Sequence, residues 1–196
     1  DRTHKMLERN SSALTGLLIN KGRIVFEGYK EPARYDSKMH SMSMSKSLTA
    51  LVIGNLYCDG KINGLDDKAI KYAHWLDPNT YGDTTIRNLL MMASGMKKQG
   101  KYGQPIREAY ARLRNQRIAV PWVLSNNQNH SRTHKQGTNH LYNSGDTLAL
   151  SQVTRAFGGL VKNFNFFIWS KIGPEHEGPW MVDKRGHAIS FAGFNA

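Results

Sequence analysis

The apolar positions follow a strand-like pattern near the start of the chain and a helical spacing further along. Two short stretches rich in Leu, Ile, Val and Phe flank Lys21 and Gly22. A glycine between two such stretches favours a tight turn, so residues 14–29 are predicted to form a β-hairpin. Further on, apolar residues recur three or four positions apart and predict a helix that ends at Asp59-Gly60. Its inward face is predicted to carry Leu48, Leu51, Val52 and Leu56.

Further helices are predicted in the remainder of the chain. One begins at a threonine cap and carries Ile86, Leu89 and Leu90 before it stops at Gly95. Another fits residues 105–117, because Pro105 suits a first helical position. The remaining predictions are a helix after Ser144-Gly145-Asp146 that ends at Gly158-Gly159, a helix over 164–171, and a hairpin over 180–194 that turns at Lys184-Arg185-Gly186. Strands followed mostly by helices and a small hairpin indicate an α+β fold class.

Composition limits the class of protein without naming a function. The chain has 196 residues, enough for one domain that needs no disulfide or metal to fold. Cys58 is the only cysteine, so no intrachain disulfide can form, and the compartment stays open. No run of about 18 apolar residues is present, so no membrane-spanning helix is predicted.

The formal net charge of +12 arises largely between Lys97 and Lys135, where nine Lys or Arg residues accompany one acid, Glu108. Such a charge attracts anions, including nucleic acids and membrane head groups. No zinc-finger, RNP or basic-zipper pattern accompanies it, so nucleic acid is an unlikely partner. A solvated basic face is the favoured interpretation.

The candidate chemistry lies at the start of the first predicted helix, in the sequence Ser43-Met44-Ser45-Lys46. Ser43 and Lys46 are three residues apart, a spacing that places both on one helix face. A serine hydroxyl becomes a good nucleophile only when a base takes its proton. A lysine can act as this base when burial or a nearby cation favours its neutral amine. The alternative is structural: Ser43 or Ser45 caps the helix, and Lys46 is solvated.

Three segments in order favour the catalytic interpretation. HSMSMSKSLTALVIGNLYCDGKI resembles the active-serine helix of the serine β-lactamase and penicillin-binding-protein superfamily, most closely its class C-like branch, which includes esterases and 6-aminohexanoate-dimer hydrolases. TIRNLLMMASGM is similar to the helix and Ser-Gly segment that follow the nucleophile in this branch, and GTNHLYNSGDTLAL is similar to its tyrosine loop. WMVDKRGHAISFAGFNA looks like a hairpin of the amidohydrolase-type members.

The resemblance implies a role for each matching residue. Ser43 is the acylated nucleophile, Lys46 its base, and Tyr142 passes a proton to the leaving group. Ser144 stands at the third place of the Tyr-x-Asn or Tyr-x-Ser motif, which suits esterases and amidohydrolases better than β-lactam-specific enzymes. Tyr102 resembles a substrate-contacting tyrosine of the nylon oligomer hydrolases, although an exposed loop tyrosine is as good an interpretation.

The resemblance also implies a β-lactamase-like fold, an antiparallel sheet with a helical subdomain, that is incomplete at its C-terminus. Family members carry a third motif on a later strand, which also supplies the second oxyanion amide, and the sequence stops before it. We therefore expect a single partial domain, with N-terminal strands in 1–38, the nucleophile helix and helical subdomain in 39–178, and a hairpin in 179–196. A second chain or a further C-terminal segment is expected to complete it.

The expected function is a serine hydrolase that forms an acyl-enzyme on a small ester or linear amide, in the periplasm or cytoplasm of a bacterium. One alternative is a cell-wall DD-peptidase or true β-lactamase; another is an inactive family member that binds an anionic partner through its basic region. No cofactor or metal is expected. His130 and His134 have a metal-ligand spacing, but their polar surroundings favour a loop.

Overall fold

The computed structural model describes the chain except for residues 1, 11, 98–110, 116, 118 and 126–131. It divides into two compact units, Asp1–Met39 and His40–Ala196.

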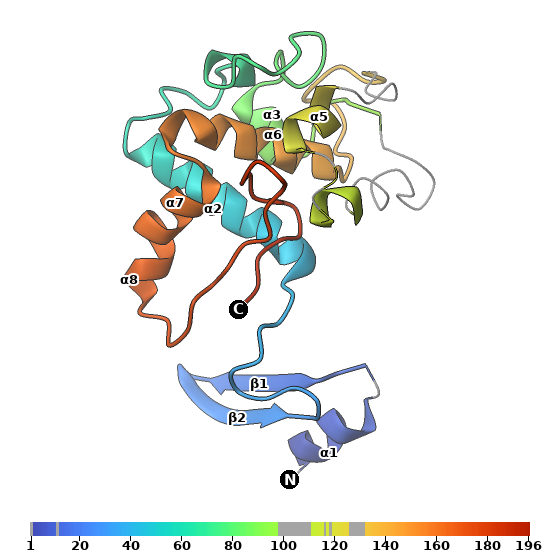
Figure 1. The fold of residues 1–196 in the computed structure, drawn as a ribbon, viewed down its shortest axis with the longest axis vertical. Coiled ribbons are helices and arrows are strands. Elements are labelled where there is room, and N and C mark those ends of the chain that lie inside the picture. Colours follow the sequence, from blue (N-terminus) through green and yellow to red (C-terminus); the bar gives the residue numbers. More distant parts are fainter. Residues whose placement is uncertain (1, 11, 98–110, 116, 118, 126–131) are drawn as a thin grey trace. The chain divides into compact units, whose positions relative to one another are not determined.

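The first unit is a β-hairpin with one helix (Figure 1). Strands β1 (Thr15–Asn20) and β2 (Arg23–Tyr29) are antiparallel, with Asn20 opposite Arg23, which confirms the predicted hairpin. Lys21 and Gly22 both have positive φ, 48° and 75°, as a two-residue turn of this twist requires. Helix α1 (Arg2–Arg9), whose buried residue is Leu7, was not predicted from the sequence. The Leu7 methyl carbons lie beside the hairpin glycines Gly16 and Gly28, so α1 packs on the hairpin.

The second unit begins with a 3₁₀ turn (Met42–Met44) that continues into α2 (Ser45–Cys58). A 3₁₀ turn (Ala69–Lys71) then leads to the short helix α3 (Ile86–Leu90). Thr85 caps α3 by accepting a hydrogen bond from Asn88 N, as predicted, but the helix ends at Leu90 instead of Gly95. After α3 come a single helical turn at 111–114, α5 (Val120–Ser125) and α6 (Ser144–Thr154), which ends in a 3₁₀ turn (Arg155–Phe157). A last helical run consists of α7 (Leu160–Phe164), a π-helix (Asn165–Trp169) and α8 (Ser170–Ile172).

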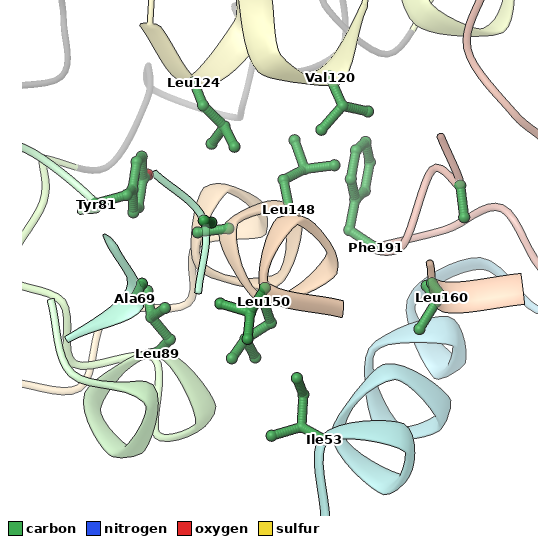
Figure 2. Close-up of a cluster of buried hydrophobic side chains, with 14 of the residues drawn as sticks. Ile53, Ala69, Tyr81, Leu89, Val120, Leu124, Leu148, Leu150, Leu160 and Phe191 are labelled. Carbon is green, nitrogen blue, oxygen red and sulfur yellow. The ribbon is translucent and has the colours of Figure 1, made fainter. Parts of the chain in front are cut away.

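Helix α6 is the centre of this unit. Every residue from Gly145 to Thr154 is buried, because α2, α3, α5 and α7 all pack around it. Figure 2 shows Leu148 and Leu150 of α6 among side chains from these helices, including Ile53, Leu89 and Leu124. A helix buried on all sides cannot show a one-sided apolar stripe. The sequence pattern therefore does not indicate that α6 lies at the centre of the core, and only the packing of the other helices around it does.

The C-terminal hairpin is held to the helices by aromatic side chains. Its turn lies at Lys184-Arg185-Gly186 as predicted, but its arms pair through single bridges, Val182 with Ala188 and Trp180 with Phe194, instead of a continuous ladder. The rings of Phe164, Trp180 and Phe194 have centroids 5.1–5.5 Å apart. Edge-to-face packing at this separation stabilises the hairpin against α7.

Several sequence-based expectations are corrected or only partly met. Leu51 was expected on the inward face of α2, but it is 52% exposed, and Ile53 is buried instead. Of the helix predicted over 105–117, residues 111–114 are helical, but Asn115 and Arg117 are not, so the helix ends earlier than predicted; 105–110 and 116 lie outside the described residues. Helix α5 was not predicted. No helix in the described part of the chain is long and apolar enough to cross a bilayer.

Candidate active site

Backbone geometry at the start of α2 places Ser43 and Lys46 together. Met42 has a positive φ of 47°, unusual for a residue with a Cβ, and the chain then turns through Ser43 into the helix. Ser43 is exposed, whereas the Lys46 side chain turns inward and the residue is only 9% exposed. The Lys46 Nζ donates a hydrogen bond to Ser43 Oγ at 3.2 Å. The three-residue spacing therefore brings the amine to the hydroxyl, as the sequence predicted.

The amine of Lys46 has two other neighbours. It donates a hydrogen bond to the carbonyl oxygen of Phe191, 2.9 Å away, in the C-terminal hairpin. It also lies 4.9 Å from the ring centroid of Tyr142 and 5.5 Å from that of Phe191. Aromatic faces attract a cation and exclude water from it. Phe191 was not among the residues chosen from the sequence, because nothing in its local pattern indicates contact with Lys46.

Tyr142 lies at the open side of this group and is 47% exposed. Burial raises the pKa of its phenol, but hydrogen bonds from Lys46 and Ser43 and the charge of Lys46 outweigh burial and lower it. The side chains of Ser43, Lys46 and Tyr142 therefore form one connected group. In such a group, a proton can pass between the serine hydroxyl, the lysine amine and the tyrosine phenol.

The tyrosine loop is fixed on both sides of Tyr142. Before it, Leu141 N donates to the carbonyl oxygen of Met92 at 2.8 Å. After it, Asn143 caps α6 by accepting a hydrogen bond from Gly145 N, and its amide donates to the buried hydroxyl of Tyr81 at 3.2 Å. Three distant segments thus hold the phenol at its place beside Lys46.

Hydrogen bonds from the C-terminal hairpin fix the entry to α2. The Ser41 hydroxyl donates to the Phe194 carbonyl at 2.8 Å, and Phe194 N donates to Ser45 Oγ at 3.1 Å. One turn further along α2, the Thr49 hydroxyl donates to the Ser190 carbonyl at 3.2 Å. Ser45, one of the possible helix caps, is therefore buried and bonded to the hairpin, whereas Ser43 is left to face outward.

Asp146 is a buried carboxyl that was not predicted as a site residue from its sequence. It is fully buried in the first turn of α6 and accepts hydrogen bonds from Ser94 Oγ at 2.8 Å and Ser94 N at 3.3 Å. Burial raises the pKa of Asp146 to about 7, although the bonds from Ser94 and the charge of Arg132 oppose the shift. Arg132 in turn donates to the Ser94 carbonyl at 2.9 Å. The sequence does contain a signal for Asp146, because an acidic residue in the first turn of the helix after the tyrosine motif can be recognised there.

The other residues selected from the sequence are less closely connected. Ser144 is the first residue of α6 and half-buried, and no hydrogen bond between described residues joins it to Ser43, Lys46 or Tyr142. Tyr102 and His130 lie outside the described residues. Within the described part of the chain, no three His, Cys, Asp or Glu side chains gather as a metal site would need.

Comparisons with known proteins identify the family and the fold of the chain. The Beta-lactamase family matches residues 7–161. A candidate 6-aminohexanoate-dimer hydrolase from Bacillus anthracis superposes with a TM-score of 0.78 at 23% identity over 98% of this chain and 52% of its own. A D-stereospecific amidohydrolase from Streptomyces sp. gives 0.65 at 16% identity, over 87% of this chain and 60% of its own.

A third solved structure is EstCE1, a hydrolase with promiscuous acyltransferase activity, which gives a TM-score of 0.66 at 17% identity over 89% of this chain and 61% of its own. No curated protein matches the sequence. The chain spans 52–61% of the length of these three solved structures. At 16–23% sequence identity, the similarity shows that the fold is shared. With a family match over most of its length and a β-lactamase-like fold in its solved neighbours, the chain belongs to the Beta-lactamase family.

Proposed function

We propose that the chain carries the nucleophile of a serine hydrolase that acts on small esters or linear amides through an acyl-enzyme. The observation that supports this most directly is the hydrogen bond between Lys46 Nζ and Ser43 Oγ, beside the phenol of Tyr142. The amidohydrolase and the acyl-transferring hydrolase among the solved structures support the same class of reaction.

In the first step, Ser43 Oγ attacks the carbonyl carbon of the substrate. A neutral Lys46 amine can accept the hydroxyl proton across the same 3.2 Å separation, while it keeps its hydrogen bond to the Phe191 carbonyl. The carbonyl π electrons move to oxygen and give a tetrahedral oxyanion. The backbone N–H of Ser43 is our candidate for one of the donors that stabilise it.

In the second step, the bond between the carbonyl carbon and the leaving group breaks. The leaving alcohol or amine takes a proton from the Tyr142 phenol, and the phenolate is then protonated by the ammonium of Lys46. The lowered pKa of Tyr142 favours this relay, because a phenol that ionises more readily is a better proton donor. Water then attacks the ester of Ser43 with the same groups as base and acid, and the free serine returns.

We further propose that the complete enzyme includes a protein segment that covers the outer face of α2 and finishes the catalytic site. A groove of about 600 Å³ lies along this face. Its wall includes Leu51 and Tyr57, which are 52% and 44% exposed, and the exposed Cys58. Apolar side chains on a core helix are normally covered. The greater length of the solved relatives supports such a segment.

The proposal predicts that a fluorophosphonate probe labels Ser43. Labelling is followed by intact mass and peptide mapping, in the wild type and in Ser43→Ala and Ser47→Ala. Ser47 is an exposed serine one helical turn away and serves as the matched control. We expect Ser43→Ala to lose labelling and the hydrolysis of p-nitrophenyl esters, while Ser47→Ala retains both. Labelling that persists in Ser43→Ala would exclude Ser43 as the nucleophile.

A substrate panel separates the alternatives within the superfamily. Short acyl esters and linear amides should be turned over faster than a chromogenic cephalosporin or a D-alanyl-D-alanine peptide. Preference for either of the last two would replace the proposed substrate class by a β-lactamase or a DD-peptidase. No turnover of any substrate, together with no labelling, would favour the inactive family member.

A further inference from the structure

A second hollow lies away from the proposed catalytic group. It has a volume of about 90 Å³ and is formed where the end of α6, the start of α7 and the C-terminal hairpin turn meet. None of Ser43, Lys46 and Tyr142 lines it. The side chains that give it its chemistry are Arg155, Lys162 and His187, beside the backbone of Gly158 and Gly159.

Arg155 is held firmly in this wall. Its guanidinium lies 4.1 Å from the ring centroid of Trp75, and its Nη1 donates to Gln152 Oε1 at 2.9 Å. That bond uses one of the five N–H donors of an arginine. Burial lowers the pKa of Arg155, Asp183 opposes this shift, and Arg185 adds to it. The guanidinium is therefore partly desolvated beside another cation, a position that a bound anion would stabilise.

Lys162 adds a second positive charge next to Gly158. A Cβ atom at Gly158 would lie 3.0 Å from Lys162 Cδ and 3.5 Å from its Nζ, so the side chain folds over the glycine turn. Among the ion pairs of the described residues, none involves Lys162. The ammonium is thus positioned at the cavity, and no carboxylate in the described part of the chain forms an ion pair with it.

Asp183 is the acid beside the hairpin turn, and its oxygens are already engaged. They accept hydrogen bonds from Val120 N at 2.6 Å, from Arg185 N at 2.8 Å, and from His187 N and Nδ1 at 2.9 and 3.0 Å. The carboxylate is 2% exposed. It orients the imidazole of His187 at the cavity wall and has little capacity left to bind Arg155 or Lys162.

We propose that this cavity is a binding site for a small oxyanion of the phosphate class, held by Arg155 and Lys162 with His187 as a further contact. The volume corresponds to about three water molecules, which suits a free tetrahedral anion and is too small for a nucleotide. The planar guanidinium suits bidentate binding to such oxygens, and the ammonium supplies a point charge. This site does not depend on the catalytic proposal.

Binding here would add a link between elements that already contact one another, as Phe164 of α7 and Trp180 of the hairpin do. The anion would link the end of α6 and the start of α7 to the hairpin turn. The same hairpin carries the Phe191 carbonyl that holds Lys46. A ligand that binds only the folded protein raises its unfolding temperature with concentration.

The test measures inorganic phosphate binding by isothermal titration calorimetry and by thermal unfolding, with chloride at equal ionic strength as the reference salt. The variants are Lys162→Gln and, as a matched control, Lys171→Gln. Both lysines are exposed and belong to the same helical run, and each substitution removes one positive charge. We expect phosphate to bind the wild type and Lys171→Gln alike, and Lys162→Gln roughly fivefold or more weakly, because a charge-assisted contact is lost.

Lys162→Glu provides a second arm. The reversed charge should abolish phosphate binding, while unfolding in chloride stays close to that of the wild type because the side chain is exposed. Equal weakening in Lys162→Gln and Lys171→Gln would show that phosphate responds only to the overall charge of the chain and would overturn the site. The same conclusion follows if phosphate stabilises the wild type no more than chloride does.

Discussion

Lys46 has a constrained environment for a residue of its type. It is 9% exposed, and its amine contacts a serine hydroxyl, a backbone carbonyl and the faces of two aromatic rings. These contacts hold the amine at hydrogen-bonding distance from the Ser43 hydroxyl, where the proposed mechanism needs it.

At the scale of this residue pair, the lowered pKa of Tyr142 predicts a pH dependence. Because the Tyr142 phenol gives its proton to the leaving group, the turnover of a linear amide should fall as the pH rises and reach half its maximum below the ordinary phenol pKa of 10.0. In Tyr142→Phe we expect this pH-dependent fall to disappear and the turnover at neutral pH to drop by about 100-fold, a typical loss for one acid–base group. Tyr57→Phe, which changes an exposed tyrosine of α2, is the control. Identical pH profiles for all three proteins would remove Tyr142 from the mechanism.

At the scale of elements, three segments are joined by buried polar groups. The tyrosine loop is attached to the segment after α3 through Leu141 and Met92, and α6 is attached to the same segment through Asp146 and Ser94. Buried polar groups that are fully satisfied specify one arrangement, since any other would leave them without partners. These bonds therefore fix where the tyrosine loop and α6 lie relative to the segment after α3.

The raised pKa of Asp146 predicts that stability depends on pH. The folded protein binds this proton more tightly than the unfolded chain, since the pKa is about 7 when folded and 3.8 for an ordinary aspartate. The stabilisation is fully present below pH 3.8 and is lost as the pH rises through about 7, an effect on the order of a few kcal/mol.

Urea unfolding across this pH range tests the prediction. Asp146→Asn keeps a hydrogen-bonding side chain and cannot ionise, so its free energy of unfolding should change less between pH 4 and 7 than that of the wild type. Asp59→Asn alters an exposed carboxylate of a surface ion pair and should leave the wild-type slope in place. An unchanged slope in Asp146→Asn would show that another group causes the dependence.

At the scale of the whole molecule, the outer face of α2 carries apolar side chains that no other part of the described chain covers. Buried residues of α2 such as Val52 and Leu56 are fully covered, while Leu51 on the opposite side is half-exposed. The excess of basic residues keeps the protein away from its isoelectric point, which opposes association through that face.

The exposed groove predicts that Leu51→Ser is well tolerated by the chain as it stands. We expect its free energy of unfolding to change by less than about 0.5 kcal/mol, as for most surface substitutions. Binding of the apolar dye ANS should fall, because the substitution removes apolar surface. Leu56→Ser, on the buried side, should destabilise by about 3 kcal/mol or more. A comparable loss of stability in Leu51→Ser would mean that this chain already covers the residue.

Local features were predictable because they depend on a few neighbouring residues. The hairpin turn needs two residues that tolerate positive φ, the Thr85 cap needs one side-chain oxygen, and Ser43 and Lys46 meet because three residues nearly complete one helical turn. Each can be recognised within a short window of sequence.

The remaining features depend on packing between distant segments. Lys46 is separated by 145 positions from the carbonyl that holds it, and Asp146 by 52 from Ser94. No periodicity connects such pairs, since their contact follows from how α6, α2 and the hairpin pack. The same applies to Leu51, whose apolar character predicted burial although packing left it exposed. The candidate nucleophile Ser43 could thus be identified from the sequence. The Phe191 carbonyl beside Lys46, the buried Asp146 and the cavity lined by Arg155 and Lys162 depend on the tertiary structure, because each is formed by segments far apart in the chain.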